Sequence, residues 1–430
     1  MTDVDAAPPT GSRGDAPPVS RDWARRQRRG HTPRNRTGGV GPKGVAVYGF
    51  ATLVFVAGLV SLVWKGWETS LDIKGGSSFQ AVTDPTKPGY EAQVKPVPNH
   101  LVLNVDAEGR LTDAELLVRI GAKDGGGSGV IMPIPGATLI ESDAGPAELT
   151  DYLADHGVDA AVGQLERILG FAITDTVTLS PQQITEMFSP AGQVTFQNPD
   201  ALIATTPAGD KEIRYGAGEL TLAAADVPAY LSFGSDGEAA INRSVRLGIV
   251  LEAWIESIRA NPALAPKIAP LEPVVGEGQV DLADLFTSLA AGTVSYPNLP
   301  VQTIPIPGAG GAAVYRPDAE KIEQLVPSLV PYPTSAFPGQ RARTRVLNGT
   351  PDRDAAPRAA ATIVGAGAEI TVFGNATGGT KDVTTVEYHD EGAAAAAEKI
   401  ASALGVTATR SSSQTEAYDV TVTLGADFKG

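Results

Sequence analysis

The chain has 430 residues, of which 42% are hydrophobic, and its formal net charge is −15. It is long enough for more than one domain, and it contains no cysteine, which excludes disulfides, thiolate metal sites and cysteine nucleophiles. The four histidines lie far apart in the sequence and form no HExxH motif, which argues against a zinc site.

Residues 44–64 form an uncharged segment of 21 residues, GVAVYGFATLVFVAGLVSLVW. At about 1.5 Å per residue, a helix of this length spans roughly 30 Å, the thickness of a bilayer core. Tyr48 and Trp64 lie near its ends, where aromatic rings favour the membrane interface. A cleaved signal peptide is the alternative, but no small-x-small cleavage pattern follows the segment. The sequence therefore predicts an uncleaved transmembrane signal anchor.

Residues 1–43 are predicted to be a disordered, basic, cytoplasmic tail. They contain nine Arg or Lys and four Asp, and little that could be buried. Cations beside a membrane span stay cytoplasmic, so we expect a single-pass plasma-membrane protein whose bulk is extracytoplasmic. Removing the tail from the totals of 34 basic and 49 acidic residues leaves 25 and 45, a net charge of −20. This charge argues against nucleic acid as a partner of the exported part.

After a predicted stalk at 65–96, expected strands and helices alternate, which indicates an α/β domain over 97–330. Ser180-Pro181-Gln182-Gln183 has the form of a helix capping box. PGAGG at 307–311 leads into an extended run, so it is expected to close a hairpin rather than bind phosphate. The strands are expected at 101–105, 115–120, 130–134, 177–179, 193–196, 301–306 and 312–315, and the helices at 146–154, 160–169, 242–259 and 281–290.

A proline-rich linker at 331–342 separates this domain from a second one at 343–430. The expected order of elements in the second domain is β-α-β-β-α-β. This order predicts a small split βαβ sheet with helices on one face, folding as a separate unit.

Several motifs of the second domain resemble, in order, the C-terminal domain of LytR-CpsA-Psr proteins. They are RVLNGT (345–350), TTVEYHDEGAAAAAEKIASALG (384–405) and DVTVTLGADF (419–428). The resemblance covers about 343–428 and implies a bacterial cell-envelope protein.

Residues 97–260 resemble the catalytic domain of the same family at fewer positions. Asp106 and Asp113 match its two acidic positions, and Arg110 lies between them. Arg243 and Arg246 match two positions of an Arg-x-x-Arg-Gln helix motif.

Other family positions are substituted. Gly136 and Ala137 stand where the family's Pro-Arg-Asp-Thr motif has arginine and aspartate, and Leu247 replaces the glutamine of the helix motif. The family's Tyr-x-Arg-x-Arg strand falls near Tyr230, where the sequence YLSFG lacks both arginines.

The resemblance implies transfer of a glycopolymer from a polyprenyl-pyrophosphate carrier to peptidoglycan. A pyrophosphate leaving group needs arginines and a divalent cation to stabilise its charge. Asp106 and Asp113 are therefore candidate Mg²⁺ ligands, and Arg110, Arg243 and Arg246 are candidate phosphate ligands; no catalytic residue is assigned. The alternatives are polar strand ends for the aspartates, and a solvated pair bridging to Glu238 for Arg243 and Arg246.

Because so many charged positions are substituted, we expect a degenerate ligase, a pseudoenzyme that binds lipid-linked glycan or cell wall. An active phosphotransferase with an altered site is one alternative. A purely structural envelope scaffold is the other.

Overall fold

The computed structural model describes residues 82–121, 127–235, 238–268, 282–306, 312–413, 415 and 417–429. The predicted tail, the predicted anchor at 44–64 and most of the predicted stalk lie outside these residues. Within the described ranges, no helix is both long and apolar enough to cross a membrane.

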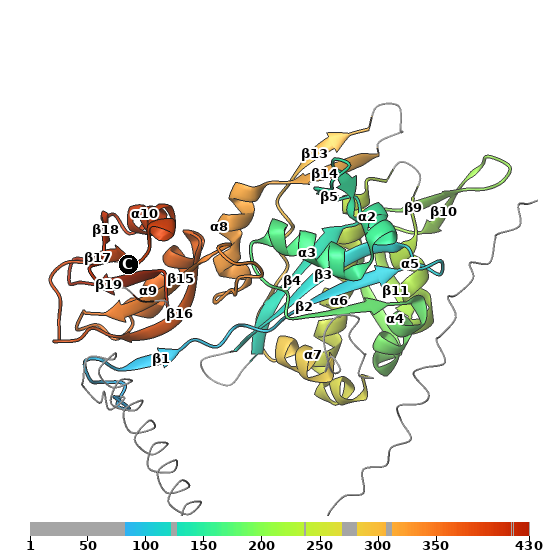
Figure 1. The fold of residues 1–430 in the computed structure, drawn as a ribbon. Helices are drawn as coiled ribbons and strands as arrows, with labels where there is room; N and C mark the ends of the chain where they lie inside the picture. Colours follow the sequence, from blue (N-terminus) through green and yellow to red (C-terminus); the bar gives the residue numbers. More distant parts are fainter. Residues whose placement is uncertain are drawn as a thin grey trace, which may run out of the picture. The chain divides into compact units, whose positions relative to one another are not determined.

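A five-stranded mixed sheet is the centre of the first α/β domain (Figure 1). Strand β3 pairs antiparallel with both β2 and β4, whereas β7 joins β2, and β12 joins β4, in parallel. In spatial order the strands are β12 (Val294–Ser295), β4 (Gly127–Pro135), β3 (Leu111–Gly121), β2 (Asn99–Val105) and β7 (Asp175–Leu179).

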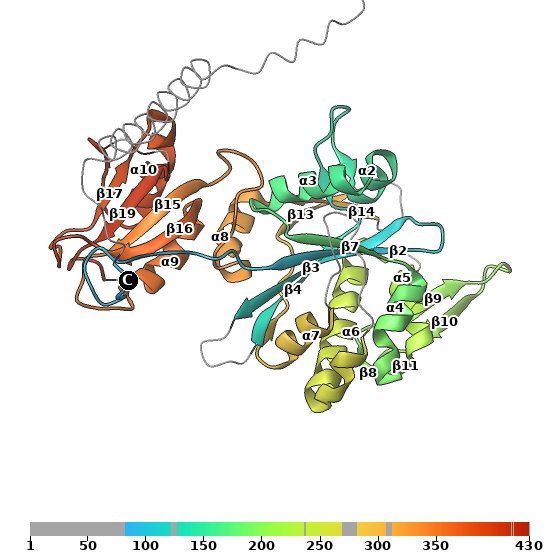
Figure 2. The same cartoon turned by 60° about the horizontal axis from the view of Figure 1, so that its bottom comes forward.

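Helices cover both faces of this sheet (Figure 2). Because side chains alternate along a strand, Leu116 of β3 packs in one core and Leu117 in the other. One face is covered by α2 (Leu149–His156) and α3 (Val158–Leu169), and the other by α4 (Pro181–Phe188), α6 (Ala240–Ala260) and α7 (Leu282–Ala290). The predicted α/β organisation is confirmed, and every helix predicted at 146–290 is present.

The capping box at the start of α4 is confirmed. Ser180 Oγ accepts a hydrogen bond from the backbone N–H of Gln183, and the Gln183 side chain accepts one from the backbone N–H of Ser180. The predicted hairpin around 307–311 is also present: β13 (Val301–Pro305) pairs antiparallel with β14 (Ala313–Pro317). Asp318 then caps α8 (Ala319–Leu329).

The region around Tyr230 differs from the prediction. Tyr230 lies in the short helix α5 (Val227–Ser232), which has Pro228 in its first turn, so the prediction of a strand there is wrong. A proline early in a helix is favourable because it lacks only an N–H that would be unpaired anyway.

Several short strands were not predicted, because runs this short give a weak pattern. Two antiparallel pairs precede α5, and a further small hairpin precedes α2. The three pairs are β8 (Gln193–Asn198) with β11 (Gly218–Ala223), β9 (Leu202–Thr205) with β10 (Lys211–Tyr215), and β5 (Leu139–Ile140) with β6 (Ala147–Glu148). Of these, only β8 was expected.

The C-terminal domain is built on a six-stranded sheet with the order β1-β16-β15-β19-β17-β18. Helix α9 connects the neighbouring parallel strands β15 and β16, and α10 connects the neighbouring parallel strands β17 and β18. The elements are β15 (Ala342–Asn348), α9 (Ala355–Gly365), β16 (Ala368–Asn375), β17 (Thr385–Tyr388), α10 (Ala394–Ala403), β18 (Ala408–Arg410) and β19 (Val420–Leu424).

The prediction of a split βαβ sheet is therefore wrong. In a split unit another strand separates the two parallel strands, whereas here each helix connects direct neighbours. The order of elements along the chain was nearly right, but it does not determine the lateral order of strands.

The edge strand β1 (Glu91–Gln93) comes from the predicted stalk and pairs antiparallel with β16. An ion pair between Arg345 of β15 and Glu91 reinforces the contact. The C-terminal sheet thus includes a strand from far outside residues 343–430. We expect the isolated segment 343–430 to expose the edge of β16.

Candidate functional site

A cluster of charged and polar side chains is buried between β3 and the first turns of α6. Its members, called the α6 cluster below, are Asp113, Glu238, Ser244 and Arg246. Asp113 lies on the same face of β3 as Leu117, so it points toward the core beneath α6. Ser244 Oγ donates a hydrogen bond of 2.6 Å to Asp113 Oδ1. This bond joins the strand to the helix.

The side chain of Arg246 is buried. Only 2% of it is exposed, and its Nη2 donates to the Phe233 carbonyl at 2.6 Å and lies 3.4 Å from Glu238 Oε2. The guanidinium also lies 5.3 Å from the ring centroid of Tyr230. Burial lowers the pKa of Arg246, although Glu238 acts in the opposite direction. The predicted bridge to Glu238 is present, but it is buried rather than solvated.

Arg243 lies one helical turn before Arg246 and is half-buried. Its positive charge acts on both Asp113 and Arg246, which places it beside the cluster. Within the described part of the chain, its Nε has no hydrogen-bond partner. Arg246 also has two unpartnered nitrogens, Nε and Nη1, but its side chain is only 2% exposed. Of the two arginines predicted to form a phosphate clamp, Arg243 is therefore the more accessible one.

Asp113 and Glu115 carry perturbed carboxyl groups. Burial raises the pKa of Asp113 to about 7, against the effects of the Ser244 hydrogen bond and of Arg243. Glu115 lies two residues after Asp113 on β3. Its burial and the negative charge of Asp113 raise the pKa of Glu115 well above its usual value. Glu115 Oε2 accepts a bond of 2.6 Å from Asn104 Nδ2. Glu115 was not predicted; the only signal was a second acid on the same face of the strand as Asp113.

Asp106 and Arg110 are partners of each other at the tip of the β2–β3 hairpin. Arg110 donates to Asp106 from its backbone N–H, from Nε at 3.0 Å and from Nη2 at 2.8 Å. Slight burial acts to raise the pKa of Asp106, but these bonds lower it overall. The structure therefore gives Asp106 and Asp113 different partners.

Both predicted Mg²⁺ ligands have hydrogen-bond partners within the described part of the protein. In the described ranges, no group of three or more His, Asp or Glu side chains is arranged to hold a metal. Asp113 is paired with a hydroxyl in the α6 cluster, and Asp106 is paired with Arg110 at the hairpin tip. Mg²⁺ binding remains a prediction.

The backbone around Gly136 leaves no room for a side chain at this position. A Cβ atom on Gly136 would lie 2.9 Å from the backbone oxygen of Thr112 and 2.5 Å from Thr150 Oγ1. Real Cβ contacts are not this short, so a side chain at position 136 requires the β3 backbone to shift. Replacing Gly136 by arginine therefore does not simply restore the family site.

Residues 341–428 match the family model LytR_C, described as LytR cell envelope-related transcriptional attenuator. The C-terminal domain predicted from the motifs at 345–428 is confirmed. No curated protein matches the sequence significantly.

Solved structures of LytR-CpsA-Psr proteins are similar to just over half of the chain. TagV of B. subtilis is 16% identical, with 55% of this chain and 96% of TagV covered and a TM-score of 0.41. The LytR-Csp2A-Psr enzyme from Actinomyces oris is 19% identical, with coverages of 55% and 94% and a TM-score of 0.41. YwtF (TagT) of B. subtilis, solved with octaprenyl pyrophosphate lipid, is 17% identical, with coverages of 58% and 94% and a TM-score of 0.39. These matches name the family that the motifs resemble, and the roles of residues are argued below from the contacts of this chain.

Proposed function

We propose that this chain, with its LytR C-terminal domain at 341–428, is a LytR-CpsA-Psr-like cell-envelope protein that binds a polyprenyl-pyrophosphate-linked glycopolymer without transferring it efficiently. The observation that carries this proposal is the α6 cluster with Arg243 beside it. Asp113 and Arg246 of the cluster, together with Arg243, occupy positions that resemble the family's acidic and Arg-x-x-Arg motifs. The octaprenyl pyrophosphate bound to YwtF is the corresponding ligand in that protein.

Binding of a pyrophosphate is assigned to Arg243. A guanidinium binds two phosphate oxygens at once, and such charge-assisted bonds are strong. The nearby Asp113 opposes a phosphate less than a free aspartate would, because burial raises its pKa to about 7. At and below neutral pH, a large fraction of this carboxyl is uncharged.

Transfer of the glycopolymer is expected to be slow because the other two predicted phosphate ligands, Arg246 and Arg110, already have partners within the protein. Arg246 is buried against Glu238 and Phe233, and Arg110 is paired with Asp106. Removing one donor that stabilises transition-state charge typically costs about 10²–10³ in rate. Robust transfer would instead support the active phosphotransferase, and the absence of both binding and transfer would support the scaffold.

The proposed location is the outer face of the plasma membrane, with residues 44–64 as the anchor and the N-terminus in the cytoplasm. This follows from the apolar segment and the basic residues before it. Protease added to intact spheroplasts should digest the chain beyond residue 65 and leave the tail. Protection of the C-terminal domain would show that the orientation is wrong.

The binding test uses calorimetry on the detergent-solubilised full chain with geranylgeranyl pyrophosphate. We expect saturable binding that weakens with salt and a Kd that rises about tenfold or more in Arg243→Ala, since a hydrogen bond to a charged group contributes about 1.5–3 kcal/mol. The matched control is Arg353→Ala, which changes an exposed arginine of the C-terminal domain. Equal affinity in Arg243→Ala and the wild type would exclude the proposed phosphate contact.

A further inference from the structure

Two clefts with shared lining residues are formed by the C-terminal sheet and the predicted linker at 331–342, and no residue of the α6 cluster lines them. One has a volume of about 1060 Å³ and the other about 440 Å³, and both are lined by Glu369 and Tyr418. Together they are called the C-terminal groove, whose lining includes Tyr332, Ser335, Arg341, Glu369, Arg410 and Tyr418. Since small-molecule pockets measure roughly 300–1,000 Å³, the groove is large enough for a chain of several units.

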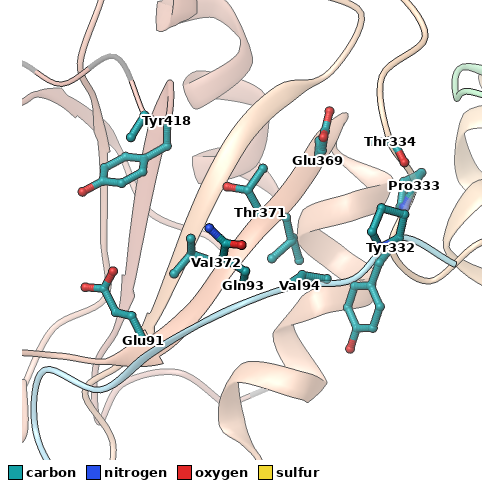
Figure 3. A pocket seen from close by; sticks show the side chains of 13 residues that line it. Glu91, Gln93, Val94, Tyr332, Pro333, Thr334, Glu369, Thr371, Val372 and Tyr418 are labelled. Atoms are coloured by element: carbon teal, nitrogen blue, oxygen red, sulfur yellow. The ribbon is translucent and has the colours of Figure 1, made fainter. Parts of the chain in front are cut away.

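The smaller cleft has one tyrosine near each end and polar side chains between them. Figure 3 shows Tyr418 and Glu91 at one end and Tyr332 at the other, with Gln93 and Thr371 between them. Rings spaced in this way offer flat apolar faces, and the side chains between them offer hydrogen-bond donors and acceptors.

Two residues that line the larger cleft each have a buried side-chain atom without a partner among the described residues. These atoms are Ser335 Oγ and Arg341 Nε. Arg341 is only 5% exposed, and its Nη2 donates to the Val364 carbonyl at 3.2 Å. Buried polar groups are nearly always hydrogen-bonded, so this hydroxyl and this guanidinium nitrogen are groups that a ligand in the cleft can satisfy.

The charges of the groove exclude the most common polymeric ligands. Four carboxylates and three arginines line the two clefts, so neither a polyanion such as nucleic acid nor a polycation meets a complementary surface.

We infer that the C-terminal groove binds an uncharged oligosaccharide. Sugar hydroxyls and acetamido groups both donate and accept hydrogen bonds, so they are compatible with a lining of both charge signs. Their C–H faces pack on aromatic rings such as Tyr332 and Tyr418. The protein then has a second glycan site, separate from the pyrophosphate site and independent of the proposed function of the α6 cluster.

The test is calorimetry on the full chain in detergent with tetra-N-acetylchitotetraose as the probe. Ser335→Ala removes the unpartnered hydroxyl without breaking any described hydrogen bond. Its matched control is Ser328→Ala on α8, whose exposed hydroxyl donates to the Leu325 carbonyl outside the groove. We expect saturable binding and a Kd about three- to tenfold higher in Ser335→Ala only.

A second pair of variants repeats the test with charged residues. Arg410→Ala removes a groove arginine from an exposed ion pair with Glu391, and Arg358→Ala removes an arginine from an exposed pair with Asp352 that does not line the groove. Only Arg410→Ala should weaken binding. Both should melt at the wild-type temperature.

Two results would overturn the inference: no saturable binding at millimolar glycan, or equal affinity in the groove variants and their controls. Binding of geranylgeranyl pyrophosphate should be unchanged in Ser335→Ala and Arg410→Ala, so failure here is distinguishable from failure of the proposed function.

Discussion

The α6 cluster and the C-terminal groove both contain arginine–carboxylate pairs, but their exposure differs. The side chains of Arg246 and Glu238 are 2% and 8% exposed, whereas those of Arg343 and Asp419 in the groove are 46% and 29% exposed. A buried charge is stable only while its partner remains, whereas an exposed pair can separate at little cost. The first pair therefore belongs to the fold, and the second can rearrange around a ligand.

The largest expected effect comes from breaking the buried pair. Arg246→Ala leaves Glu238 buried without its partner and removes a positive charge beside Asp113. Loss of one partner of a buried pair typically costs about 3–5 kcal/mol. Thermal unfolding followed by circular dichroism should show a large fall in the melting temperature of the α/β domain. If the melting temperature falls no more than it does when an exposed ion pair is broken, the proposed difference between the buried and the exposed pair is wrong.

The second effect is a pH dependence of stability. Asp113 has a pKa of about 7 in the folded protein and about 3.8 as its reference value, so its protonated form is favoured by folding. Its contribution to stability is fully present below about pH 3.8 and is lost as the pH rises through about 7. Each pKa unit corresponds to about 1.4 kcal/mol, which gives an upper limit of about 4 kcal/mol.

Asp113→Asn tests this contribution, because an amide can still accept the hydrogen bond from Ser244 but cannot ionise. Relative to the wild type, the variant should gain about 1–3 kcal/mol between pH 4 and pH 8, less than the limit because Arg243 and Arg246 lose an attractive charge. Melting curves at several pH values give this difference. Glu115 acts in the same direction, so some pH dependence should remain. If the stabilities of the two proteins change with pH in the same way, the pKa of Asp113 is not raised by folding.

The smallest expected effect is at the exposed pair. Arg343→Ala removes bonds to Asp419 from a pair whose two side chains both contact solvent. Exposed pairs typically contribute up to about 1 kcal/mol, so the melting temperature should change little. If the melting temperature falls as much as in Arg246→Ala, the solvent exposure of an ion pair does not determine its contribution to stability here.

Local features were predictable from the sequence. The capping box of α4 depends on residues three positions apart, and the hairpin around 307–311 depends on a short glycine-rich turn. The apolar stripe of α6 follows from 3.6-residue periodicity, which places Leu247, Leu251 and Trp254 in the core. In each case the controlling contacts lie within one element.

Features that depend on distant contacts were not predictable. Ser244 and Asp113 are 131 residues apart, so nothing local indicates that a helix hydroxyl pairs with a strand acid. The burial of Arg246 depends on Glu238 and on the α5 helix, which was expected to be a strand. The pairing of β1 with β16 joins segments almost three hundred residues apart. The topology of the C-terminal sheet was wrong for another reason, because the order of elements along the chain does not determine the lateral order of the strands.

The most direct test of the central claim is a transfer assay with the wild-type full chain in detergent, labelled polyprenyl-pyrophosphate-linked glycopolymer, peptidoglycan and Mg²⁺. Calorimetry on the same sample with geranylgeranyl pyrophosphate shows whether the pyrophosphate site is functional. Our account predicts saturable binding and no transfer above the level without protein, because the other charges are engaged within the fold. Sustained transfer of the label to peptidoglycan would contradict it and identify an active phosphotransferase.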